Sequence, residues 1–400
     1  MQALPADLLW HVTKTTTFTS IRQMCSRYLH ILSIPLKIAA AFNYVSRVLA
    51  AHVKITAIDK YGRMQFTCTI PASAAGRTPD SRRAIQVLAA ADNVAVHCMF
   101  HEHPELVGIC ALPGMYAADL SYCCNLTDVS MLGGLHTLNL AYCAAVKDVS
   151  ALGGLHTLNL TWCFAVTDVS ALGGVHTLNL TWCTAVTDVS ALGGVHTLTL
   201  MNCSGVADVS VLGGVHTLNL EQCRQIRDVS MLGNVHTLVL SGCRQVSDVS
   251  ALGRLYSLDV ADCPRVTDIS ALGRLHTLIL AGCTGVTDVS MLGGLHTLSL
   301  AWCAELTDIS ALGGLHTLAI MMCPVGRHIG VLAKVHTLNA AYCGDLTDVS
   351  ALGGVHTLNI SHCVSITDVS ALGQVHELDL SGCRGVTDVS ALGRVHILVR

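Results

Sequence analysis

A cysteine recurs every twenty residues along most of this chain. It occupies fourteen positions in fixed phase from Cys123 to Cys383, without an insertion or deletion. Thiolates bind zinc well, so such a row raises the question of a metal site. Zinc sites use clustered CxxC pairs, and the row contains none. We therefore interpret the cysteines as buried thiols that behave as small hydrophobic residues, and we expect no metal and no cofactor.

A second column of reactive side chains runs in parallel with the cysteines. Thirteen histidines lie between His136 and His396 at the same spacing, with Tyr256 as the single substitute. Histidine is both a metal ligand and a pH switch near neutrality. Imidazoles stacked about 5 Å apart resist simultaneous protonation. We therefore expect mostly neutral rings at pH 7 and no bound metal.

Both columns belong to one repeating unit. Leucines keep the period from Leu132 to Leu392 and from Leu138 to Leu398, and an aspartate column from Asp128 to Asp388 fails only at His328. A unit of this size is too small to bury its own apolar side chains, so successive units must stack and share one core. This requirement overrules the division into several globular domains that 400 residues would otherwise suggest.

The unit from Leu135 to Leu152 matches the pattern LxxLxLxxCxL with one residue added after the cysteine. It resembles the leucine-rich repeat, over about seven tenths of the chain. The resemblance implies an α/β solenoid of about fourteen coils, with a parallel β face and 3₁₀ or irregular chain on the convex side. In this family the cysteine packs beneath the turn and bonds to backbone groups. Asp148 is expected to accept amides where the outer turn starts.

Alternation along the strand assigns the side chains of each coil to two faces. It puts Leu138 and Leu140 inside and leaves Thr137, Asn139 and Ala141 outside. For His136 two orientations stay open. Alternation turns it inward, whereas the family resemblance places it at the exposed lip of the concave face.

Outward positions that differ between copies are the most informative about binding. The units 151–170 and 171–190 are nearly identical, so a shared residue can simply be inherited by duplication. Aligned exposed aromatic residues are typical of interaction hot spots. The alternative is that these rings only cover adjacent strands. We predict a protein partner on the concave face, bound by Tyr122, Tyr142, Trp162, Trp182, Trp302, Tyr342, Asn139, Asn159 and Asn179.

Arginines gather in the middle of the repeats. Arg224 and Arg244 follow their cysteines, and Arg254 and Arg274 lie nearby in the sequence. A guanidinium group suits a partner phosphate or an acidic loop. We favour a solvated edge over that alternative.

The first hundred residues form a region of different composition. We divide the chain into residues 1–50, helical and F-box-like, 51–117, a capping or linking region of α+β type, and 118–400, the solenoid. Within 51–117 we predict strands at 52–59 and 63–70, a helix at 84–91 and a degenerate first coil from 94–99, and a further helix spans 38–53.

The start of the chain resembles an F-box in its LPADLLWHV and IRQMCSRY segments. On that resemblance a helical surface docks a Skp-type adaptor, and through it a cullin. The alternative is an amphipathic helix pair that only caps the solenoid. The adaptor-binding residues would be Leu4, Pro5, Leu8, Leu9, Val12, Ile21, Met24 and Tyr28.

Composition narrows the class of function. A net charge of −4 with 12% charged residues provides no basic field for nucleic acid. No apolar run reaches the ~18 residues of a membrane span, and residues 1–20 lack a secretion-signal pattern, so we expect a cytoplasmic or nuclear protein.

We also expect no enzyme and no catalytic residue. A hydrolase needs a uniquely placed nucleophile and base, whereas almost every Ser, His and Asp of the repeats is a copy, and neither GxSxG nor HExxH occurs. Our hypothesis is a non-catalytic protein-interaction module that serves as the substrate-recognition subunit of an SCF-type ubiquitin ligase. The alternative is a stand-alone scaffold with no ubiquitin link.

Overall fold

The computed structural model describes residues 52–58, 64–69, 96–99, 115–324 and 326–400. Two compact units follow each other in the chain, Met1–Cys183 and Thr184–Arg400. The F-box-like segment, residues 38–51 of the helix predicted at 38–53, and the helix predicted at 84–91 lie outside the described residues. The helix prediction is wrong for His52 and Val53, which begin a strand. The predicted division at 50 and 117 remains a prediction. Among the described residues, none belongs to a helix with the length and apolarity of a membrane span.

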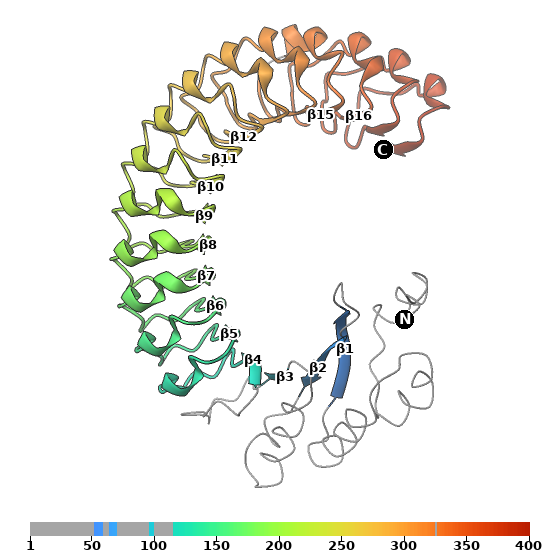
Figure 1. Ribbon diagram of the computed structural model, residues 1–400. Coiled ribbons are helices and arrows are strands. Elements are labelled where there is room, and N and C mark those ends of the chain that lie inside the picture. Colours follow the sequence, from blue (N-terminus) through green and yellow to red (C-terminus); the bar gives the residue numbers. More distant parts are fainter. Residues whose placement is uncertain (1–51, 59–63, 70–95, 100–114, 325) are drawn as a thin grey trace, which may run out of the picture. The chain divides into compact units, whose positions relative to one another are not determined.

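The first unit contains a hairpin followed by parallel strands (Figure 1). β1 (His52–Ile58) pairs antiparallel with β2 (Met64–Thr69), which confirms the two predicted strands to within a residue or two. β3 (Val96–Met99) pairs in parallel with β4 (Met115–Asp119), as expected of a degenerate first coil. The regular coils then contribute β5 (Thr137–Asn139), β6 (Thr157–Asn159) and β7 (Thr177–Asn179), alternating with the 3₁₀ turns η1 (Ser130–Leu132), η2 (Ser150–Leu152) and η3 (Ser170–Gly174).

The second unit continues the same alternation of parallel strands and 3₁₀ turns. Its strands are β8 (Thr197–Thr199), β9 (Thr217–Asn219), β10 (Thr237–Val239), β11 (Ser257–Asp259), β12 (Thr277–Ile279), β13 (Thr297–Ser299), β14 (Thr317–Ala319), β15 (Thr337–Asn339), β16 (Thr357–Asn359), β17 (Glu377–Asp379) and β18 (Ile397–Val399). Its turns are η4 (Ser190–Gly194), η5 (Ser210–Gly214), η6 (Ser230–Leu232), η7 (Ser250–Leu252), η8 (Ser270–Leu272), η9 (Ser290–Gly294), η10 (Ser310–Gly314), η11 (Gly326–Leu332), η12 (Ser350–Gly354), η13 (Ser370–Leu372) and η14 (Ser390–Leu392).

The strands pair in a register of one repeat, so equivalent side chains stack on one another. Leu138 lies beside Leu158, and Leu158 beside Leu178. Leu138 and Leu140 are fully buried, as predicted. The outward position predicted for Ala141 is wrong, because this side chain is only 7% exposed. The strand ends at Asn139, so the two-residue alternation does not extend to Ala141.

Each outer turn starts beside an aspartate. The Ser150 amide donates to Asp148 Oδ1 at 2.9 Å, and the contact recurs at Asp168 and Ser170. The predicted interaction of this carboxylate with a turn amide is thereby confirmed. The coil with His328 in place of aspartate differs, since its turn η11 extends from Gly326 to Leu332.

Close backbone contact between coils explains the first of the two glycines after each turn. A Cβ atom on Gly153 would collide with the carbonyl oxygen of Ala171 in the next coil, whereas one on Gly154 would lie 3.5 Å from the Gly133 oxygen. Stacking therefore favours glycine at the first position, which is glycine in thirteen coils and Ala333 in one. The second position tolerates a side chain, and it holds Arg254 and Arg274 in two coils.

Candidate partner-binding surface

The cysteine column is part of the core. Cys143 Sγ donates to the Leu120 carbonyl oxygen at 3.0 Å, and Cys163 Sγ to that of Leu140 at 3.1 Å. Burial raises the pKa of the Cys143 thiol to about 12, so it stays protonated at neutral pH. The prediction of buried thiols bonded to backbone groups is confirmed. A protonated thiol is neither a nucleophile nor a zinc ligand.

The histidine column lies at the exposed lip of the strand face. His156 precedes its strand, so the two-residue alternation that would have turned it inward does not apply to it. The rings of His136 and His156 stack with centroids 4.5 Å apart, and His156 Nδ1 lies 3.2 Å from Thr157 Oγ1. Burial lowers the pKa of His136, and a charge on His156 lowers it further, in the direction expected.

The same spacing disfavours a metal between neighbouring rings. Two nitrogen ligands of one tetrahedral zinc ion lie roughly 3.3 Å apart. The centres of the stacked His136 and His156 rings are farther apart, at 4.5 Å. Within the described part of the chain, no three His, Cys, Asp or Glu side chains are grouped to hold a metal ion.

Four aromatic residues of the first unit form what we call the aromatic stack: Tyr122, Tyr142, Trp162 and Trp182. Their successive ring centroids lie 4.4, 5.6 and 5.0 Å apart. Tyr122 and Trp182 remain 41% and 36% exposed, and Phe164 adds an edge contact to Trp162 at 5.2 Å. The stack lies in the turns just beyond the three-residue strands, and its role in binding a partner on the concave face remains a prediction.

The backbone under the aromatic stack adopts a conformation that favours glycine. The φ angles of its four residues lie between 62° and 65°. A non-glycine residue in this left-handed region costs roughly 1–2 kcal/mol. The same turn holds Gly242, Gly282 and Gly382 in other coils, and Asn202 in one. The fold therefore does not require an aromatic residue here.

The asparagines predicted to bind a partner have a structural role that the sequence did not reveal. Asn159 Oδ1 accepts the Thr161 amide at 3.0 Å, and Asn159 Nδ2 donates to Asn139 Oδ1 at 3.0 Å. Asn179 makes the equivalent bond to the Thr181 amide. Two coils carry Asp259 and Asp379 in place of asparagine, and both residue types have an oxygen that accepts the amide two residues later. This replacement is the sequence signal from which the structural role could have been predicted. Their role in binding remains a prediction.

A second exposed apolar group lies in the second unit. Trp302, Met322 and Tyr342 are 57%, 36% and 44% exposed at the same turn position in successive coils. The Tyr342 ring stacks on His362 at 4.4 Å. Met322 and Tyr342 line a depression of about 480 Å³ together with Pro324 and Asp345.

The sequence matches no known family and no curated protein. Similar solved structures include an internalin from Listeria monocytogenes, 18% identical, covering 74% of this chain and 87% of that one, with a TM-score of 0.42. The functional domain of InlJ from the same species, described as including a cysteine ladder, is 20% identical over 69% of this chain and 73% of that one, with a TM-score of 0.41. A leucine-rich-repeat protein from Leptospira interrogans is 15% identical over 70% and 92%, also with a TM-score of 0.41.

These TM-scores, all below 0.5, do not indicate a function for this chain. The class follows from this chain's own geometry. Twenty-residue coils pair in register, with buried leucine and cysteine columns and 3₁₀ turns opposite the strands. The protein is a leucine-rich-repeat solenoid.

Proposed function

We propose that this protein is a non-catalytic scaffold for another protein and that the aromatic stack holds apolar side chains of that partner. One observation carries the proposal. Trp162 and Trp182 occupy left-handed turns that three other coils fill with glycine, and the Trp182 ring is exposed while the Trp162 ring is half-buried. Selection for binding explains residues that the backbone itself disfavours.

The surroundings of the stack suit recognition. The Trp162 amide donates to the Thr181 carbonyl oxygen at 2.9 Å, and the Tyr142 amide to that of Thr161 at 2.7 Å, so hydrogen bonds between coils hold the turns. Stacked rings on a rigid backbone lose little conformational entropy when a partner binds. Aromatic anchors of this kind dominate the energetics of many interfaces.

A glycine substitution separates binding from folding. The double variant Trp162→Gly, Trp182→Gly carries glycine at both turns, as the wild-type chain does at the equivalent positions Gly242 and Gly282. Loss of stacking and relief of the left-handed strain offset each other, so stability should stay within about 1 kcal/mol of wild type. Affinity for a partner mapped by photo-crosslinking at Trp162 should fall at least about a hundredfold.

The matched control is Gln222→Gly, which makes the same change at the same turn position of the second unit. It should leave that affinity unchanged. A partner that binds the double variant as tightly as wild type would refute the proposed surface.

A narrower version of the proposal makes the scaffold the substrate-recognition subunit of an SCF-type ubiquitin ligase in the cytoplasm or nucleus. It rests on the F-box resemblance of the segment that carries Leu4, Pro5, Leu8 and Leu9. A Skp-type adaptor should co-purify with wild type and be lost from Leu8→Asp, Leu9→Asp. In a stand-alone scaffold those changes leave partner binding intact and no adaptor is recovered from either protein.

A further inference from the structure

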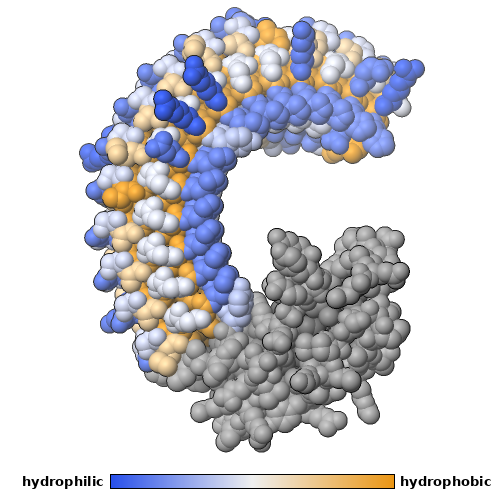
Figure 2. Space-filling model, in the orientation of Figure 1, coloured by the Kyte–Doolittle hydropathy of each residue, from blue (hydrophilic) through white to orange (hydrophobic). Residues whose placement is uncertain are grey.

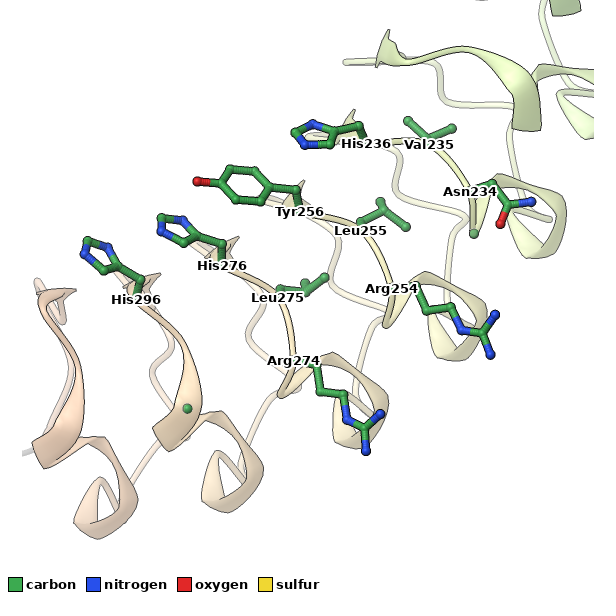
Figure 3. Close-up of a pocket in the computed structure, with 12 residues that line it drawn as sticks. Asn234, Val235, His236, Arg254, Leu255, Tyr256, Arg274, Leu275, His276 and His296 are labelled. Carbon is green, nitrogen blue, oxygen red and sulfur yellow. The ribbon is translucent and has the colours of Figure 1, made fainter.

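A shallow depression of about 650 Å³ lies on the second unit, and we call it the basic depression. It is lined by Arg254 and Arg274, by Tyr256 and by His236, His276 and His296 (Figure 3). It involves none of the residues of the aromatic stack, so its role is independent of the function proposed above.

Figure 3 shows the ring side chains and the arginine side chains of the lining in two separate rows. The rings of His236, Tyr256 and His276 project on one side and stack with centroids 4.8 and 4.6 Å apart. The Arg254 and Arg274 side chains leave successive outer turns on the other side and run alongside each other without converging.

The floor of the depression, between the two rows, contains apolar residues. Leu255 and Leu275 lie there, 3% and 2% exposed. Figure 2 shows the corresponding hydrophobic band next to a hydrophilic band along the repeats.

Departures from the repeat gather at this place. The position of Arg254 is glycine in eight coils, from Gly134 to Gly354. The position of Tyr256 is histidine in all thirteen of the other coils from His136 to His396. In an array of near-identical copies, three changes facing one depression indicate selection for a ligand at that depression.

The charge of the depression has one sign. Its lining contains two arginines and no carboxylate. By contrast, the depression around Lys147 includes Asp148 and Asp168, and the one around Arg227 includes Asp208. The aspartates nearest to the two arginines in the sequence, Asp248, Asp259 and Asp268, accept backbone amides at 2.9, 2.9 and 3.0 Å.

We infer that the basic depression binds an acidic segment of a polypeptide in extended conformation, whose carboxylates pair with Arg254 and Arg274. A guanidinium group pairs with a carboxylate through two parallel hydrogen bonds. Two arginines that do not converge suit charges spaced along a chain better than a single small anion. The apolar floor accommodates the methylene groups of glutamate side chains, which inorganic phosphate lacks.

The test uses the full chain and a fluorescent peptide of four Glu-Ser repeats, with a Gln-Ser peptide as the uncharged match. Wild type should bind the Glu peptide, and added salt should weaken the complex. Arg254→Gly, Arg274→Gly restores the residue of eight other coils and should weaken binding about tenfold or more. Gly294→Arg adds a third charge to the lining and should strengthen it.

Arg394→Gly makes the same replacement in the same column outside the depression and should have no effect. The inference is overturned if the double variant binds the Glu peptide like wild type or if the Gln peptide binds equally well. It is also overturned if inorganic phosphate binds in an arginine-dependent way while the Glu peptide does not. None of these outcomes bears on the aromatic stack, because Trp162→Gly tests that surface separately.

Discussion

The turns after the strands differ between the two units although their backbone is the same. In the first unit they carry Tyr122, Tyr142, Trp162 and Trp182, and in the second unit Asn202, Gln222 and Gly242 start the equivalent row. All these residues have a positive φ, and the amides of Tyr142 and Gln222 each donate to a carbonyl oxygen of the next coil. The fold of the repeat thus leaves the side chain at this turn free to vary, which is what the proposed binding role of the aromatic stack requires.

A side chain at the first glycine position should disturb the stacking of coils equally in both units. This change should have the largest effect on stability among the proposed substitutions. Gly153→Ala and Gly313→Ala each place a Cβ against a carbonyl oxygen of the next coil. Each should cost about 1–3 kcal/mol of unfolding free energy in chemical denaturation. Gly154→Ala and Gly314→Ala, with nearest atoms at 3.5 and 3.4 Å, are the controls and should cost far less. Equal losses within each pair would contradict the role of the first glycine.

The left-handed turn should show a moderate effect. Gly242 has a φ of 73°, and its neighbouring contact is the flexible Gln222 side chain. Gly242→Ala should therefore cost about 1 kcal/mol through backbone strain alone. Asn202→Gly, the reverse change at the same turn, should stabilise the protein or leave it unchanged. If Gly242→Ala instead stabilised the protein, the turn would not need a positive φ at this residue.

Acid should weaken the solenoid through its aspartate column. The Ser150 hydroxyl and then its amide hold the pKa of Asp148 below its usual 3.8. The folded-state pKa is depressed, so the stabilisation is complete above pH 4 or so and is lost as pH falls through the folded-state value. Asp148→Asn, Asp168→Asn keeps the acceptor oxygens but removes the titration. Its thermal midpoint should fall less between pH 5 and pH 2.5 than that of wild type, and an equal fall would contradict this account.

The histidine column should show the smallest effect. Burial lowers the pKa of His216, followed by the charges of His236 and His196. Nuclear magnetic resonance should find His216 titrating below the usual 6.5, and His236→Gln should raise its pKa. Because the folded-state pKa is depressed, stability falls as pH drops from the unfolded-state value through the folded-state one. A pKa for His216 above 6.5 would refute the claim that burial and the neighbouring histidines lower it.

Much of the fold could be predicted because each coil repeats the same local demands many times. The buried leucines, the bonded thiols and the aspartates that accept a turn amide follow from residue type and spacing. The binding surface could be predicted only in part. The aromatic column was identified, but Trp162 lies beyond the three-residue strand, where alternation no longer indicates direction.

The sequence by itself determined the period, and with it the stacked core, since no single coil can bury Leu138, Leu140 and Cys143 alone. Tertiary structure decided the rest. It placed His156 at the exposed lip, gave Asn159 a structural bond to its neighbour, and brought Arg254, Tyr256 and Arg274 to one depression. The physical reason is that these contacts join residues twenty positions apart. Their geometry depends on how one coil lies on the next, which no single repeat encodes.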